Sequence, residues 1–188
     1  LGNNSLGANT TASDNTAIGY NSLLSNTTGA GNTSIGASAL DANTTGGSNI
    51  AVGKNALSAN ITGDYNTAVG TDALIVNTTS GNTAVGRQSQ KATTTGASNT
   101  SVGKHSMYSN TSGASNVAVG DDALSGNTTA SFNTAVGRLA MAANTTGHSN
   151  EAIGYESLRA NTTGYYNTAL GTQALQAVTT GNRNIGIG

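Results

Sequence analysis

The amino-acid sequence repeats with a fixed period of seventeen positions along its whole length. The segment from Asn15 to Gly19 returns at residues 32–36. The same pattern begins again at Asn49, Asn66, Asn82, Asn99, Asn116, Asn133, Asn150, Asn167 and Asn184. Only the spacing from 66 to 82 is shorter, by a single residue, and the missing residue falls beside Ser80 and Gly81. We therefore interpret residues 1–188 as one repeat array, with a partial unit at 1–14, ten units at 15–183 and a second partial unit at 184–188.

Numbered from its first Asn, the repeat unit reads N-T-A-[IV]-G-x-x-[SA]-L-x-x-N-T-T-G-x-x. A pair of helices with a turn needs about 30 residues or more, so helical repeats do not fit this period. The recurrent Gly and Asn disfavour helices, whereas Thr and Val favour strands. The sequence predicts an all-β fold, a parallel β-solenoid of about eleven coils. We expect strands at positions 1–5 and 8–11, a turn at N-T-T-G, and coils ~4.8 Å apart in a rod of about 50 Å.

Side chains alternate along a strand, so positions 2 and 4 share one face and positions 1, 3 and 5 share the other. We expect two large apolar columns to fill the interior. They are Ile18, Ile35, Val52, Val69, Val85, Val102, Val119, Val136, Ile153 and Leu170 at position 4, and Leu23, Leu40, Leu57, Leu74, Met107, Leu124, Met141, Leu158 and Leu175 at position 9. The opposite face of the first strand carries only Asn, Ala or Ser, and Gly in every unit. Because a solvent-facing surface would vary more, we expect another copy of the chain to pack against this small-residue face.

The Asn columns at positions 1 and 12 have two interpretations. An amide both donates and accepts, so identical Asn residues one coil apart can form a hydrogen-bonded ladder. The Asn-Thr-Thr triplets, for example at Asn26, Asn43 and Asn161, also match the N-glycosylation pattern. Glycans on neighbouring coils would lie only ~5 Å apart, so the ladder is favoured.

Composition excludes several classes of protein. The chain has no Cys, so it has neither disulfides nor a Cys zinc site. Its formal net charge is −1 and 8% of its residues are charged, so it lacks the basic excess of a nucleic-acid-binding protein. No apolar run approaches the ~18 residues of a membrane span, and no signal-peptide segment is present. We expect no partnership with nucleic acid and no membrane insertion.

The repeated N-[TS]-A-[IV]-G-x-x-[SA] motif closely resembles the head repeat of YadA-like trimeric autotransporter adhesins. Residues 34–39 and 100–106 carry the match, and similar arrays occur in phage tail fibres and other bacterial trimeric fibre proteins. The resemblance covers the whole chain. It implies a left-handed parallel β-roll, a side-by-side homotrimer, and a place in an extracellular fibre, on a cell surface or a virion, that binds surfaces. The chain departs from the usual head repeat in its inserted N-T-T-G turn. Because it begins and ends within a unit, we expect it to be a segment of something longer.

No catalytic constellation is recognisable in the sequence. His105 and His148 occupy different unit positions and lie more than two coils apart, so we interpret both as isolated surface residues. Asp121 and Asp122 are the only adjacent acidic pair, and neighbouring residues usually point apart. Neither a calcium-binding nonapeptide nor a phosphate-binding loop is present. We expect no enzyme activity, no cofactor and no metal.

Two sets of side chains are candidates for contact with a target surface. Lys54, Arg87, Lys104 and Arg138 form a partial basic stripe at position 6, and Tyr65, Phe132, Tyr165 and Tyr166 lie at positions 16 and 17 on the turn edge. The stripe has the charge to meet anionic glycans or envelope components of a host cell or matrix, but Thr71 and Asp121 interrupt it, and a solvated column of mixed charge is the simpler interpretation. The aromatic residues suit contact with sugars or packing against a neighbouring subunit.

The sequence therefore favours a non-enzymatic structural and adhesive fibre segment, a stiff rod that acts through multivalency. An ice-binding solenoid is the first alternative, because Thr recurs at positions 13 and 14. Adjacent residues should point opposite ways and give one outward Thr column, and the Thr column at position 2 is broken by Ile50, Val117 and Glu151. A self-assembling filament subunit is the second alternative.

Overall fold

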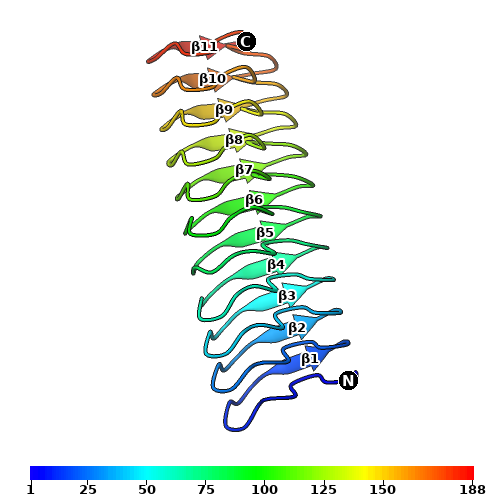
Figure 1. The fold of residues 1–188 in the computed structure, drawn as a ribbon. Coiled ribbons are helices and arrows are strands. Elements are labelled where there is room, and N and C mark those ends of the chain that lie inside the picture. The colour runs from blue at the N-terminus through cyan, green and yellow to red at the C-terminus, as the bar shows by residue number, and fades with distance from the viewer.

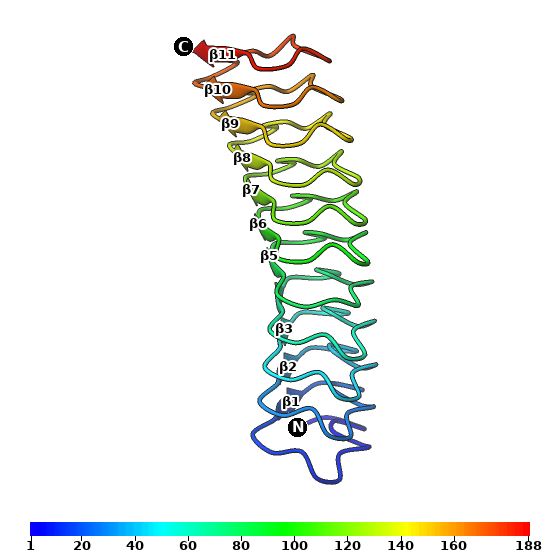
Figure 2. The same ribbon diagram turned by 90° about the vertical axis from the view of Figure 1, so that its left-hand side faces the viewer.

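A computed structural model describes all 188 residues and shows a rod of stacked coils, with the two termini at opposite ends (Figure 1). Each coil contributes one short strand. The strands are β1 (Thr16–Ile18), β2 (Thr33–Ile35), β3 (Ile50–Val52), β4 (Thr67–Val69), β5 (Thr83–Val85), β6 (Thr100–Val102), β7 (Val117–Val119), β8 (Thr134–Val136), β9 (Glu151–Ile153), β10 (Thr168–Leu170) and β11 (Ile185–Ile187). They form one parallel sheet in sequence order along one side of the rod (Figure 2). The predicted parallel β-solenoid is confirmed.

Strand register follows the repeat. Thr16 pairs with Thr33 and Ile18 with Ile35, so each unit position stacks on the same position of the next coil. The sheet holds only 20 of the 119 backbone hydrogen bonds. Most of the remaining bonds also join neighbouring coils, as when the Leu57 N–H donates to Ala73 O at 3.0 Å. Stacking is thus continuous around each coil rather than confined to the strands.

The predicted second strand at positions 8–11 does not form. Instead, every second residue from position 5 to position 9 has a positive φ, with 134° at Gly53 (position 5), 55° at Asn55 (position 7) and 55° at Leu57 (position 9). These residues turn the chain into a ribbon of bends that forms the wall opposite the sheet. Glycine is required at position 5, because a Cβ on Gly19 would lie 2.5 Å from the carbonyl oxygen of Gly36 in the next coil.

The N-T-T-G segment bends as predicted, but without a left-handed residue; the left-handed position of this corner is 17, where Ser48 has a φ of 57°. Thr27 and Thr28 are both exposed, so the expectation of a single outward Thr column at this turn is wrong. Adjacent side chains share a side here because the backbone is bent rather than extended.

The side chains of the first strand point in the directions opposite to those predicted from the sequence. Position 3 is buried in every full unit, whereas the position 4 column, predicted to lie inside, points outward. Ile18 is 41% exposed and Ile153 is 44% exposed. The small-residue face, predicted to contact another copy, is instead the interior of the chain's own coil. The position 9 column is buried as predicted, except that Leu175 in the last complete coil is only half-buried.

The narrowness of the coil explains the inversion. The Leu or Met side chain at position 9 points toward the sheet in each coil. The space that remains beside the sheet fits only Ala or Ser at position 3. Ser22 at position 8 donates a hydrogen bond to Ser34 O at 2.9 Å, so the two walls are in direct contact. A second column of Ile or Val pointing inward would overpack this interior.

The Asn columns form the predicted ladders. Asn43 donates through Nδ2 to Asn26 Oδ1 at 2.9 Å in the preceding coil, and the Asn49 backbone N–H donates to Asn32 Oδ1 at 2.9 Å. Both columns also donate to one carbonyl: Asn32 and Asn43 each bond Gly46 O at 2.9 Å. Asn26, Asn43 and Asn161 are fully buried with their amides bonded, so the folded coil does not present them as glycan acceptors.

The buried apolar residues divide into two clusters along the rod. One extends from Ala17 to Ala84 and the other from Met107 to Ala174. Between them Gln90 occupies position 9, fully buried, and donates to Thr83 O at 2.9 Å and Ser101 Oγ at 3.0 Å. A polar layer therefore interrupts an otherwise apolar interior.

Candidate functional site

The outward face of the sheet carries a column of exposed and half-buried apolar side chains along the rod. Its side chains at position 4 stack in register from β1 to β10, and Ile50, Val117 and Ile185 at position 2 widen the stripe. Val102 is 40% exposed and lies beside Val119, which is 36% exposed. Continuous exposed apolar stripes of this kind mark association surfaces. We call it the sheet face.

The side chains at position 6 border the sheet face. Lys54, Arg87, Lys104 and Arg138 are all exposed, and none forms an ion pair. The Arg138 guanidinium lies 5.9 Å from the centre of the Tyr155 ring. Asp121 separates Lys104 from Arg138, and its buried Oδ1 has no hydrogen-bond partner. The predicted stripe is thus a mixed column, in which Thr71 and Asp121 interrupt the cations.

The aromatic residues at positions 16 and 17 separate into one cluster and two isolated rings. Tyr165 stacks on His148 with centroids 5.2 Å apart, and Tyr166 lies edge-on to both. The Arg183 guanidinium lies 6.0 Å from the Tyr166 ring centre. Tyr65 and Phe132 are 72% and 67% exposed, and neither contacts another aromatic ring. His148 is therefore not isolated, contrary to the expectation from sequence.

A groove runs along the wall opposite the sheet, between the position 7 column and positions 10 and 11. Its first lobe, about 370 Å³, is lined by Gln88, His105, Tyr108, Ser109, Asp122, Ser125, Gly126 and Ala142. Its second lobe, about 500 Å³, is lined by Leu139, Ala142, Ala143, Arg159, Ala160, Gln176 and Ala177. Ala142 lines both lobes, so the two lobes adjoin along the rod.

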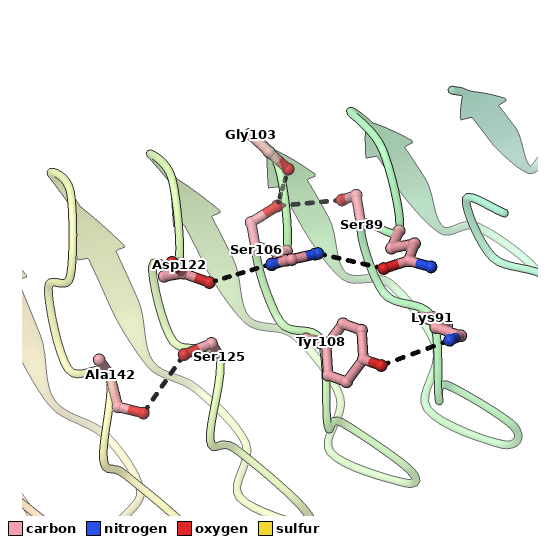
Figure 3. A network of polar contacts seen from close by, with 10 residues as sticks. Ser89, Lys91, Gly103, Ser106, Tyr108, Asp122, Ser125 and Ala142 are labelled. Carbon is pink, nitrogen blue, oxygen red and sulfur yellow. Dashed lines mark hydrogen bonds and ion pairs between the residues drawn. The ribbon is translucent and has the colours of Figure 1, made fainter. Parts of the chain in front are cut away.

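Side chains from successive coils meet in the first lobe (Figure 3). His105 bonds Gln88 Oε1 through Nε2 at 3.1 Å and faces Asp122 Oδ1 through Nδ1 at 3.4 Å. The Tyr108 ring lies edge-on to His105 with centroids 5.2 Å apart, and Lys91 Nζ donates to its hydroxyl at 3.3 Å. His105 is therefore the centre of a polar cluster rather than an isolated surface residue.

A second polar cluster surrounds Glu156, which borders the second lobe and is the only buried carboxylate. The hydrogen bond from Gln173 at 3.2 Å, assisted by Tyr155 and by the charge of Arg159, lowers the pKa of the Glu156 carboxyl below its ordinary value of 4.5. Asp41, which is only half-buried, behaves in the opposite way, because partial burial raises the pKa of its carboxyl above 3.8.

Sequence reasoning missed both clusters because it compared residues within a unit rather than across units. Gln88, His105 and Asp122 all occupy position 7 and follow one another at intervals of one period, as do Glu156 and Gln173. In a stacked solenoid that separation places side chains in contact. Matching polar or aromatic residues one period apart is the signal that would have found these clusters.

No group of three or more His, Cys, Asp or Glu side chains is arranged to hold a metal ion. The chain has no helix long and apolar enough to cross a membrane. No protein-family model matches the sequence, and no match was found among curated proteins or solved structures.

Proposed function

We propose that this chain is a non-enzymatic segment of an extracellular fibre, in which three rods associate side by side through their sheet faces. One observation carries the proposal: the position 4 column of Ile and Val points outward over the length of the sheet. Apolar β-branched side chains in that position are stabilised when a second apolar surface covers them.

The dimensions of the sheet face suit contact between like rods. Eleven strands of three residues give a face about 50 Å long and about 10 Å wide. Such an area is below the ~800 Å² that each partner contributes to a standard interface, so the bordering side chains at position 6 are expected to join the contact. A repeating face also matches a copy of itself in the same register, which favours a homotypic partner.

The resemblance to YadA-like heads and phage fibres supports three rods and an extracellular location on a cell surface or virion. In this proposal adhesion arises from multivalency, because weak contacts repeated on each coil and on each rod add up. A host-cell or matrix surface, a glycan or an envelope component is the corresponding target.

Light scattering on the purified chain tests the association. We expect a mass about three times the 18.4 kDa of one chain. The double variant Val102→Lys, Val119→Lys places two charges on the sheet face and should give monomers. The matched control Ser112→Lys, Thr129→Lys adds the same charges to exposed turn residues of the same two coils and should leave the mass unchanged.

A second readout does not depend on the variant remaining folded as a monomer. The chain has no Cys, so Val102→Cys introduces a single thiol. Oxidation should crosslink Val102→Cys between chains and leave Ser112→Cys uncrosslinked. A wild-type monomer, or equal crosslinking of the two variants, would overturn association through the sheet face.

The same face provides the observation that favours ice binding as a second candidate function. Position 2 carries outward Thr side chains in regular register beside the position 4 column, interrupted by Ile50, Val117 and Glu151. This face is available to ice only when it is not covered by another rod. A monomeric chain that shapes growing ice crystals would support this candidate, and a trimer without that activity would remove it. A mass that rises continuously with concentration would indicate a self-assembling filament.

A further inference from the structure

The groove on the wall opposite the sheet is a ligand site that the fibre proposal does not require. We infer that it binds a linear, uncharged oligosaccharide, whose sugar rings lie along the rod axis against Tyr108 and the position 7 side chains. The inference goes beyond the proposed fibre function, because it concerns the opposite wall and holds for one rod or three.

The first lobe combines the two kinds of group that a sugar ring needs. A sugar presents hydroxyl groups around its rim and C–H groups on its faces. Tyr108 offers an aromatic surface with a polar end, and it is held by Lys91 at its hydroxyl and by the edge contact with His105. Gln88 and Asp122 offer amide and carboxylate groups that pair with hydroxyls.

The position of these groups is fixed before any ligand arrives. Both ring nitrogens of His105 are engaged, one with Gln88 and one with Asp122, so the imidazole holds the two outer side chains in line. We assign His105 as a positioning residue and Gln88, Tyr108 and Asp122 as the residues that contact the sugar. Preorganised side chains lose less conformational entropy on binding.

The backbone along the groove argues against a peptide ligand. An extended peptide binds by adding to a free strand edge. Here the backbone amides of Gln88, His105 and Asp122 already donate to Thr71, Arg87 and Lys104 in the preceding coils. The groove therefore offers side chains but no open edge.

The charges in the groove argue for an uncharged ligand. The lining of the first lobe has one carboxylate, Asp122, which faces His105, while Lys91 lies outside the lining and donates to the Tyr108 hydroxyl. In the second lobe Arg159 pairs with Glu156 at 3.0 Å. Neither lining therefore offers an unpaired Lys or Arg to an anionic ligand. The cationic side chains at position 6, in contrast, lie outside the lining of both lobes.

The shape of the groove argues for a chain of several sugars. From Gln88 to Ala177 it crosses six coils, which span about 24 Å along the axis. Most of the lining at positions 10 and 11 is Ala, Ser or Gly, with Tyr108, Arg159 and Gln176 as the larger side chains. A linear polymer can follow such a lining, whereas a single sugar fills only one lobe.

Saturation-transfer NMR with four hexasaccharides tests the inference. The probes are β-linked glucose, β-linked N-acetylglucosamine and α-linked mannose, with a heparin hexasaccharide as the anionic comparison. We expect at least one uncharged probe to bind the full chain. Tyr108→Ala should raise the Kd for that probe about tenfold, which is the effect of losing one aromatic contact. The control Tyr20→Ala removes an exposed tyrosine outside the groove and should leave the Kd unchanged.

Ser125→Trp provides a second variant, because its large side chain fills the first lobe without removing a contact residue, and it should abolish binding. Failure of every uncharged probe to bind, or binding of heparin alone, would overturn the inference. So would an equal loss in Tyr20→Ala, or full binding by both groove variants in their folded state. None of these outcomes bears on the mass of the assembly, so the fibre proposal and this inference fail separately.

Discussion

Two neighbouring coils, residues 66–81 and 82–98, differ from the regular coils on either side. In the shortened coil Asn77 donates to Thr79 O at 2.8 Å and does not reach Asn60, whose Oδ1 is left without a partner. In the next coil Gln90 replaces the buried Leu. Yet β4, β5 and β6 pair in the same register as every other strand.

The comparison shows that the sheet and the interior respond differently to changes in sequence. The sheet is joined through backbone groups of positions 2–4, which neither change touches. The interior depends on particular side-chain atoms, one Asn amide and one Leu per coil, so a single change leaves an unpaired oxygen or a polar layer. The lost residue lies between Asn77 and Thr79, not beside Ser80 and Gly81 as the sequence suggested, because Thr79 O accepts the bonds that the position 15 carbonyl accepts elsewhere.

Leu57→Gln should have the largest effect on stability, because it places a buried polar layer in a regular coil. Gln90 has Ser101 as a partner, whereas Leu57 packs in a cluster that contains Ala51 and Ala68. We expect a loss of about 3 kcal/mol in the free energy of unfolding, measured with guanidinium. The reciprocal change, Gln90→Leu, should raise stability, and a loss comparable to that of Leu57→Gln would contradict this account.

Asn127→Ala should cost about 2 kcal/mol, because it removes a ladder member with three partners. Asn127 donates to Asn110 Oδ1 at 2.8 Å and Ala130 O at 3.0 Å, and accepts from Asn144 at 3.0 Å. Asn77→Ala, in the shortened coil, is the matched variant and should cost less, because Asn77 has already lost its partner in the preceding coil. Equal changes in the unfolding midpoint would show that the ladder adds nothing.

Insertion of one Gly after Thr79 should erase the irregularity. It restores the N-T-T-G turn, so the Asn77 amide can donate to Asn60 Oδ1, with an expected gain of about 1 kcal/mol. The same insertion after Gly147 lengthens a regular coil and should destabilise the chain. Thermal unfolding of the two insertions should therefore shift in opposite directions.

The smallest expected effect on stability comes from two carboxylates on the wall opposite the sheet, and it depends on pH. Because the folded-state pKa of Glu156 is lowered, its contribution to stability is fully present above about 4.5 and is lost as pH falls through the folded pKa. Glu156→Gln should therefore reduce stability at pH 7 and lose that effect in acid. Asp41 has a raised pKa, so Asp41→Asn should stabilise the chain at pH 7, with the difference disappearing as pH falls. Denaturant unfolding from pH 3 to 7 distinguishes the two signs.

The repeat predicts everything that depends on period. The solenoid, its parallel register, the buried position 9 column and the Asn ladders follow once each residue is placed above its copy in the next unit. The inside and outside of the first strand do not follow, because the rule that large apolar residues are buried ignores the width of the coil. Ile18 and Ala17 exchange places relative to prediction because only Ala fits opposite Leu.

The second wall was also beyond the reach of pattern analysis. The apolar column at position 9 favoured a second strand at positions 8–11, but left-handed residues at positions 7 and 9 bend the chain there and still bury that column. Leu and Met rarely adopt that conformation, so no propensity rule anticipates Leu57 with a φ of 55°. The groove depends on this bent wall and on contacts between units. Its lining residues come from different units, so analysis within one unit did not bring them together.

The near-complete reliance of each coil on its two neighbours has a mechanical consequence. A coil occupies about 5 Å of rod length, but its seventeen residues extend to about 55 Å when pulled straight. A load along the axis would peel coils from an end in succession, each release lengthening the molecule by roughly ten times the height that it gives up. The rod would thus dissipate a pulling force by unfolding one coil after another from its end, while the remaining coils stay folded.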